Sequence, residues 1–259
     1  MKEFYWSKII EKAYSYRILR EIVLDWRKGY GEKYIFNKYL GNLAAYSTEE
    51  IKGFYQQKSE LGYRVYSVYD SEYFPALKEI EIPPIAFYYI GSEKMFHGEK
   101  YAGVVGSRKA LGKNLKKASA LGKGLSKQGI IGVSGLALGI DGAFHQGCSH
   151  SIGIIGCGIN VIYPRSNLQL YEKLKASGGI ISEFPIDAPP LKYHFPRRNR
   201  LIAGISQILI VLEARIKSGA LITLDYALEY GKEVFLPSSL LTEDFVEGYS
   251  IQRLKELFF

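Results

Sequence analysis

Three arginines lie within four residues in the segment Phe195-Pro196-Arg197-Arg198-Asn199-Arg200. They cannot all be buried without partners, because an unpaired buried guanidinium is very costly. Asn199 and the apolar residues after it favour a helix start, where cations oppose the helix dipole and their placement needs another reason. A bound polyanion would provide that reason. The alternative is pairing with nearby carboxylates, namely Glu183, Asp187 or Glu213.

Two further arginines follow candidate strands: Arg108 directly, and Arg165 after Tyr163-Pro164. Small residues at the strand ends allow close approach of backbone, and the helices that follow offer unpaired N–H groups to an anion. Guanidinium groups bind phosphate in a forked geometry, so several of them around such backbone predict a groove that follows a phosphate chain. The candidate binding residues are Gly106, Ser107, Arg108, Ser134, Gly135, Gly156, Gly158, Arg165, Arg197, Arg198, Asn199 and Arg200.

Other chemistry has weaker support. His145, Cys148 and His150 lie close in sequence but have no acidic ligand near them, which does not favour a metal site. Asp141 is expected to cap or to pair with a loop group, and this role fits it better than a catalytic one. The sequence has no nucleophile and base at a spacing typical of a catalytic pair, and it has no Walker phosphate loop. A dinucleotide fingerprint is also absent, because Gly156-Cys157-Gly158 lacks the third glycine. The sequence therefore predicts no metal, no cofactor and no enzyme activity.

The charge of the chain is concentrated in one block. Of 34 basic and 26 acidic side chains in 259 residues, residues 99–200 hold 15 basic and five acidic ones. A solvated basic face is one explanation, but a local excess inside a folded block more often marks a polyanion partner. Two cysteines in no metal or redox spacing, no apolar stretch near the roughly 18 residues of a membrane helix and no signal-peptide core predict a reduced, cytoplasmic protein without a membrane contact.

The elements that position these residues are expected to form an α/β fold. Short apolar runs alternate with helix-length segments, and continuous apolar runs suit strands buried on both faces of a largely parallel, doubly wound sheet. The expected strands are residues 101–106, 129–134, 151–156, 179–183, 207–213 and 232–237. Between the first two, leucines form one helical stripe and five lysines lie mainly on the opposite side.

The amino-terminal region has a different pattern of apolar residues. Apolar residues at helical spacing predict a small helical domain over residues 1–60, interrupted near Gly29–Gly31 and Gly41-Asn42. Residues 63–68 and 85–90 are expected to be strands. The second domain is expected to cover residues 61–259, with its core at 101–237.

Several motifs, in order and in register along residues 70–237, resemble the DNA-processing protein A (DprA/Smf) family. They are Gly106-Ser107-Arg108, Ser134 to Asp141, His145, Tyr163-Pro164, Ser182-Glu183-Phe184-Pro185, Phe195 to Gly204, Val211 to Ala214, and Ser218 to Thr223. The chain departs from the family pattern after the last expected strand, at Pro237-Ser238-Ser239 and at Gly248-Tyr249-Ser250.

This resemblance implies an extended Rossmann-like domain that binds single-stranded DNA and loads the RecA recombinase during natural transformation. It also implies a homodimer, and it places the DNA pocket on Gly106 to Arg108, Arg165 and the run Arg197–Arg200. The alternative from a different class is a nucleotide-processing enzyme of related fold that hydrolyses nucleoside monophosphates. That alternative calls for a Pro-Gly-Gly-x-Gly-Thr pattern, which this sequence lacks.

Overall fold

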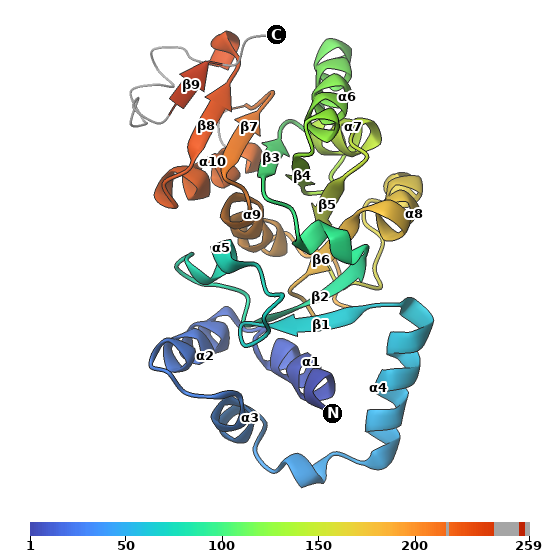
Figure 1. Cartoon of the computed structure of the whole chain (residues 1–259), viewed down its shortest axis with the longest axis vertical. Coiled ribbons are helices and arrows are strands. Elements are labelled where there is room, and N and C mark those ends of the chain that lie inside the picture. The colour runs from blue at the N-terminus through green and yellow to red at the C-terminus, as the bar shows by residue number, and fades with distance from the viewer. Residues whose placement is uncertain (216–217, 241–253, 257–259) are drawn as a thin grey trace. The chain divides into compact units, whose positions relative to one another are not determined.

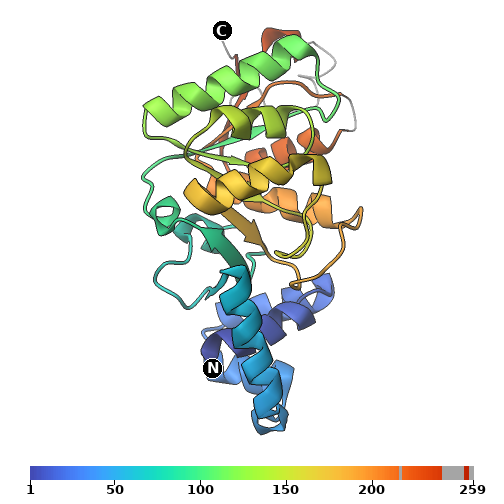
Figure 2. The ribbon, with the colours of Figure 1, turned by 90° about the vertical axis from the view of Figure 1, so that its right-hand side faces the viewer.

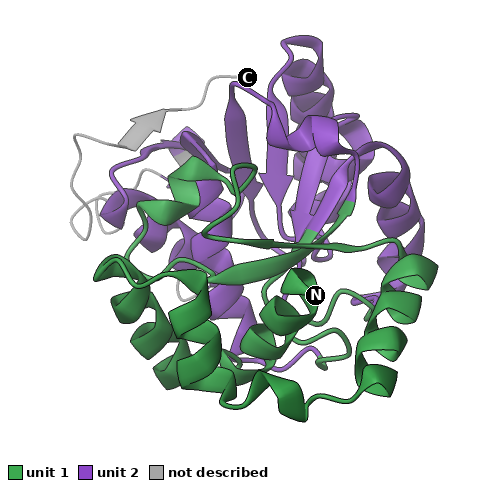
Figure 3. Cartoon of the chain, turned by 60° about the horizontal axis from the view of Figure 1, so that its bottom comes forward, with its two compact units in different colours: residues 1–90, 157–161, 181–189 green, residues 91–156, 162–180, 190–259 purple. Residues whose placement is uncertain are grey.

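The computed structural model describes residues 1–215, 218–240 and 254–256. It divides the chain into two compact units, drawn in green and purple in Figure 3. The first unit contains residues 1–90, 157–161 and 181–189, and the second contains residues 91–156, 162–180 and 190–259. The division groups the segment 61–90 with the amino-terminal helices, whereas the sequence suggested a boundary at residue 60.

Most helices of the first unit come from its amino-terminal end (Figure 1). They are α1 (Lys2–Lys12), α2 (Tyr16–Arg27), α3 (Glu32–Leu40), the 3₁₀ turn η1 (Leu43–Ala45), α4 (Thr48–Leu61) and the short α5 (Pro75–Lys78). A capping box between Ser47 and Glu50 starts α4, because each side chain bonds the other residue's backbone N–H. Gly62 ends α4 in the left-handed conformation at φ 70°. The predicted helical character of residues 1–60 is confirmed.

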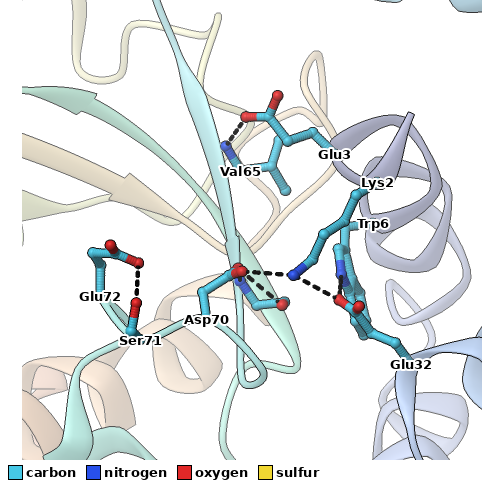
Figure 4. A network of polar contacts seen from close by, with 9 residues as sticks. Lys2, Glu3, Trp6, Glu32, Val65, Asp70, Ser71 and Glu72 are labelled. Carbon is cyan, nitrogen blue, oxygen red and sulfur yellow. Dashed lines mark hydrogen bonds and ion pairs between the residues drawn. The ribbon is translucent and has the colours of Figure 1, made fainter.

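Helix α1 packs on β1 (Arg64–Ser67), which pairs antiparallel with β2 (Ala86–Gly91). Figure 4 shows the polar contacts that fix it there. The Lys2 ammonium lies 3.0 Å from a Glu32 oxygen and 2.8 Å from an Asp70 oxygen, and Glu3 accepts a 3.4 Å bond from the backbone N–H of Val65. Trp6 is buried and donates to Glu32 at 2.7 Å. Residues 1–12 therefore complete the packing of β1.

The second unit is built on parallel strands in the order β5-β4-β3-β7-β8-β9. Their bounds are β3 (Tyr101–Val105), β4 (Ile131–Ser134), β5 (Ser151–Ile154), β7 (Ile208–Val211), β8 (Glu233–Leu236) and β9 (Leu254–Glu256), and β6 is Gly179–Ser182. The six strands predicted between residues 101 and 237 are all present, each within a few residues of its expected ends. The α/β, largely parallel fold is confirmed.

Helices cover both faces of this sheet. On one face α6 (Gly112–Lys127), α7 (Ile140–Gly147) and α8 (Leu168–Ser177) lie side by side (Figures 1 and 2), and the other face carries α9 (His194–Ile205) and α10 (Gly219–Glu229). Short 3₁₀ turns, η2 (Glu93–Phe96), η3 (Arg165–Asn167) and η4 (Ser238–Leu240), occur in the connections. A buried cluster that includes Val104, Phe144 and Ile210 joins α6 and α7 to the sheet. None of the described helices has the length and apolar composition needed to cross a membrane.

The direction of winding changes at β3. The chain proceeds from β3 to β4 and β5 on one side, and β7 returns to the other side of β3 before β8. In open α/β sheets the loops at such a switch point diverge and leave a crevice at the carboxyl ends of the strands. The fold therefore predicts a ligand site between the loops that follow β3 and β7.

Candidate nucleic-acid interface

A cavity of about 440 Å³ lies at this switch point. The loop after β3, the start of α9 and the start of α10 form most of its wall. Its charged lining residues are Arg108, Lys109, Asp141, Arg198 and Arg215. Four of these five side chains are cations, so the cavity suits an anion.

The loop after β3 provides the first wall. Gly106 is required here because a Cβ atom would lie 2.5 Å from the Ile140 side chain. The Ser107 hydroxyl accepts the backbone N–H of Lys109 at 3.1 Å, and its carbonyl accepts the N–H of Ile140 at 3.2 Å. Arg108 is exposed, and its guanidinium lies 5.0 Å from the ring centroid of Phe195. Arg108 thus offers its charge to solvent at the rim while one face rests on an aromatic ring.

Arg198 is held differently, since only 3% of it is exposed. Its guanidinium donates to the carbonyl of Gly135 at 2.6 Å and to the carbonyl of Ile154, while Nε donates to Asn199 at 3.0 Å. The Asn199 amide in turn donates to the carbonyl of Gly219 at 3.0 Å. Arg198 therefore joins the ends of β4 and β5 to α9, and Asn199 joins α9 to the start of α10.

Gly135 makes this arrangement possible. A Cβ atom at residue 135 would lie 2.6 Å from both terminal nitrogens of Arg198, so only glycine leaves room for the guanidinium. The next residue, Leu136, is buried with φ at 55°, the left-handed region that branched side chains rarely adopt. Asn167 donates to the carbonyls of Leu136 and Ala137 at 2.9 and 3.2 Å. The loop after β4 is thus fixed by contacts from both layers of helices.

Asp141 is the carboxylate of the cavity wall and is 5% exposed. Burial raises its pKa, and the positive charges of Arg198 and Arg108 and the backbone N–H groups of Ala137 and Gly135 oppose that rise. The Gly135 N–H lies 3.2 Å from the carboxylate. Asp141 therefore orders the loop that holds Arg198, so it pairs with a loop group, one of the two roles expected from the sequence, and does not cap α7.

Only part of the predicted set lines the cavity. Gly106, Ser107, Arg108, Arg198 and Asn199 do so, and Gly135 and Gly156 line a smaller hollow of about 40 Å³ beside Arg108 and Phe195. The structure divides the arginines that the sequence treated as one group. The division follows from the turns of α9, which aim successive side chains in different directions.

The remaining predicted residues lie elsewhere. Ser134 is fully buried and donates to the Val104 carbonyl at 2.6 Å, and Gly158 belongs to the first unit, where a Cβ would lie 2.1 Å from the Ile186 carbonyl. Arg165 is exposed in η3 and Arg197 is half-buried, and neither lines the cavity. Arg200 is 1% exposed and donates to the Arg197 carbonyl at 3.3 Å. Two of the three clustered arginines are therefore buried, with backbone carbonyls among their partners.

Sequence reasoning left Lys109, Phe195 and Arg215 out of the site. Phe195 lines both hollows, and Arg215 lines the cavity two residues after Glu213. The sequence could have indicated Arg215, because it comes a few residues after β7, just as Arg108 comes a few residues after β3. Glu213 accepts bonds from the Leu111 N–H at 3.1 Å and the Asn114 amide at 2.7 Å, so it anchors the start of α6.

The residues around His145 and Cys148 make contacts that hold the end of α7 in place. His145 is fully buried, its Nδ1 lies 3.0 Å from the Ser151 hydroxyl, and burial together with the nearby Lys173 charge lowers its pKa to about 3. Lys173 donates to the carbonyls of His145, Gln146 and Cys148 at the end of α7. Within the described residues, no three His, Cys, Asp or Glu side chains form a group that could hold a metal ion.

Comparison with known proteins gives consistent matches. A family model described as DNA recombination-mediator protein A matches residues 64–252. Protein Smf of Synechocystis sp. is 36% identical over 242 residues, which cover 90% of this chain and 58% of that protein. DNA processing protein DprA of Streptococcus pneumoniae is 39% identical over 181 residues, covering 68% of this chain and 64% of that protein. The chain thus spans less than two thirds of the length of either relative.

Two solved structures share the fold over most of the chain. The X-ray structure of DNA processing protein A from Streptococcus pneumoniae matches with a TM-score of 0.69 and 31% identity, covering 92% of this chain and 83% of that one. DNA processing protein A from Helicobacter pylori, whose structure concerns its single-stranded DNA binding mode, matches with a TM-score of 0.68 and 26% identity. It covers 76% of this chain and 91% of that one.

Proposed function

The chain belongs to the DNA recombination-mediator protein A family, and from this premise we propose that it binds single-stranded DNA at the cavity between β3 and β7. The observation that carries the proposal is the cavity wall. Four cations line it, three of them arginines, next to close-packed glycine backbone, and Arg108 holds its guanidinium exposed at the rim. Such a wall suits phosphates.

An aromatic ring at the same place favours a single strand. Phe195 lines both hollows, with Arg108 at 5.0 Å and Arg198 at 5.9 Å from its ring centroid. Unpaired bases stack on aromatic rings, whereas the bases of a duplex are covered by their neighbours. Because phosphate and stacking contacts carry little sequence information, we expect weak sequence preference.

The wider role follows the family. We propose that the protein acts as a recombination mediator that delivers single-stranded DNA to the RecA recombinase during DNA uptake, in the cytoplasm and as a homodimer. The two free, buried cysteines support a reduced compartment. The segment Gly248-Tyr249-Ser250, where the sequence departs from the family pattern, lies outside the described residues. A pull-down of RecA and a sedimentation measurement of oligomeric state test these two parts.

We also propose that the site binds without catalysis. Among the described residues that line the cavity, Asp141 is the sole carboxylate, and none is a histidine or cysteine. Asp141 already accepts backbone N–H groups and faces Arg198, which makes it a poor general base. The alternative function, hydrolysis of nucleoside monophosphates, requires an activated nucleophile. The described residues that line the cavity include no nucleophile with a base beside it.

Competition between DNA forms tests the proposed function. A labelled single strand is displaced by unlabelled single strand, duplex of equal length or AMP, at equal nucleotide concentration. We expect the single strand to compete best, Arg108→Ala to weaken binding, and Arg17→Ala, an exposed arginine of the first unit, to leave it unchanged. Better competition by duplex, or AMP hydrolysis that Arg108→Ala abolishes, contradicts the proposal.

A further inference from the structure

Helix α6 carries an unbalanced positive charge. Between residues 100 and 140 the chain has eight basic residues and no acidic one. Five of the eight are lysines of α6, listed here as Lys113, Lys116, Lys117, Lys123 and Lys127, and all five are exposed. The helix begins three residues after Lys109, which lines the cavity.

The five lysines share one face. With 3.6 residues per turn, their positions fall within about 120° of the helix circumference. The buried residues Ala118, Gly122 and Leu125 lie on the opposite side, against α7 and the sheet. The lysine face is therefore turned to solvent along the full helix. Sixteen residues extend about 24 Å, so this face reaches from the cavity along the flank of the second unit.

This charge pattern works against the helix itself. Lys113 with Lys116 and Lys117, and Lys123 with Lys127, are like-charge neighbours at destabilising spacings. Lys113 lies in the first turn, where a cation opposes the helix dipole, and no side chain caps that end. Within the described part of the chain, Lys113, Lys116, Lys123 and Lys127 have no ion-pair partner.

Solubility alone does not account for the pattern. The helices α1, α4 and α8 carry lysines mixed with glutamates, as in the pairs Lys8–Glu11 and Lys175–Glu172 at 3.1 Å. Such mixing keeps a surface soluble without the repulsion present on α6. A face that collects cations and excludes acids fits a polyanion that neutralises them.

We propose that the lysine face of α6 holds the DNA strand that leaves the cavity, as a second phosphate-binding track. The inference rests on the proposed function and extends it from a pocket to a path. Helix α6 has no aromatic residue, so it offers bases nothing to stack on. Lysines are flexible point charges, which suit phosphates of variable position, whereas the ordered arginines of the cavity suit a fixed one. The track contributes affinity and salt dependence without sequence preference.

Neutralising the track tests the inference on the full chain. The variant Lys116→Gln/Lys123→Gln/Lys127→Gln keeps good helix formers and removes three charges. Its matched control is Lys12→Gln/Lys33→Gln/Lys52→Gln, which removes three exposed charges from the first unit. Both are titrated against oligothymidylates of about four and about 16 nucleotides, which span the site sizes of single-strand binding folds. Circular dichroism and melting verify folding.

We expect the α6 variant to flatten the slope of log affinity against log salt by about 2 with the longer strand, at about 0.7 per phosphate contact. The same relation gives a loss of roughly 50-fold at 0.15 M salt for three contacts. The short strand, which fills the cavity alone, should bind the variant and the parent equally.

Three outcomes overturn the inference. The α6 variant can bind the longer strand with the parent's affinity and salt slope. Alternatively, the first-unit control can lose as much affinity as the α6 variant, which would show only an effect of net charge. The α6 variant can also lose binding to both lengths equally, which would place the effect in the cavity. In each of these cases the proposed function stands, provided that the parent binds single-stranded DNA and Arg108→Ala weakens that binding. If the parent binds no single-stranded DNA, both the proposed function and the inference about α6 are wrong.

Discussion

Replacing Arg198 should change the stability of the protein, whereas replacing Arg108 should change its DNA binding, although both line the same cavity. Arg198 is buried and donates to two backbone carbonyls and to Asn199, whereas Arg108 is exposed over a ring. We expect Arg198→Ala to reduce stability and Arg108→Ala to reduce DNA binding. The two readouts are the melting temperature and the salt slope of binding.

The size of the stability loss follows from the contacts. Arg198→Ala leaves the carbonyls of Gly135 and Ile154 without their guanidinium donor and removes a positive charge that opposes the raised pKa of Asp141. Losing one partner of a buried charged network costs about 3–5 kcal/mol. For a protein of roughly this size each kcal/mol shifts the melting temperature by about 2–4 °C, so the expected decrease is about 6–20 °C.

Arg108→Ala should leave the melting temperature within about 2 °C of the parent, because exposed side chains contribute little to stability. Its salt slope should be lower by about 0.7, the value for one phosphate contact. Arg198→Lys is the useful third variant, since it keeps the charge but cannot fork between two carbonyls. We expect it to melt below the parent and to retain the parent's slope.

The assays are differential scanning fluorimetry and fluorescence anisotropy at several salt concentrations, on the same preparations. The reasoning is refuted if Arg198→Ala melts like the parent while its salt slope falls by 0.7 as expected for a lost phosphate contact. Arg198 would then be a free phosphate ligand, and the role assigned to Gly135 and Ile154 would be wrong.

Two further predictions concern the rest of the chain. Because the folded-state pKa of His145 is lowered to about 3 from its ordinary value near 6.5, its contribution is fully present above about 6.5 and is lost as pH falls toward 3, at up to about 1.4 kcal/mol per pH unit. Melting curves from neutral to acid pH should show this loss in the parent and in a control with exposed His97→Gln, but less of it in His145→Gln. Deleting residues 1–60 removes the packing of α1 on β1 and the contact of Phe54 with Tyr63, and it exposes Tyr63 and Val65, so we expect dye binding and a lower melting temperature. Cooperative melting at the parent's temperature would instead support residues 61–259 as an independent domain.

The sequence predicted the strands between residues 101 and 213 well, because each is a largely apolar run that ends in glycine, serine or a charged residue, whereas the last one, 232–237, ends in a proline. Residues 101–106, for example, contain β3 and the glycine after it. The alternation does not give the order of the strands. It does predict a largely parallel sheet, in which the carboxyl ends of the strands lie at one edge, and this places Gly106 to Arg108 and the loop after β7 at that edge.

The roles of individual arginines could not be read in this way. The carbonyls that hold Arg198 come from residues 63 and 44 positions away in the chain, and no local pattern indicates them. Burial of Arg200 depends on which face of α9 packs inward, and the apolar residues after it do not show that face. The contribution of α1 to β1 was also missed, because Glu3 and Val65 are 62 residues apart.

The fit between Gly135 and Arg198 constrains how this sequence can change over time. Any side chain at residue 135 would collide with the guanidinium, and any smaller residue at 198 would leave the Gly135 carbonyl without that donor. Neither position can therefore be substituted first without a loss of fitness through stability. A lineage that abandons this arrangement must change both positions nearly together, and must also reshape the loop around Leu136. We therefore expect the two residues to be inherited as a pair, even where the surrounding surface diverges.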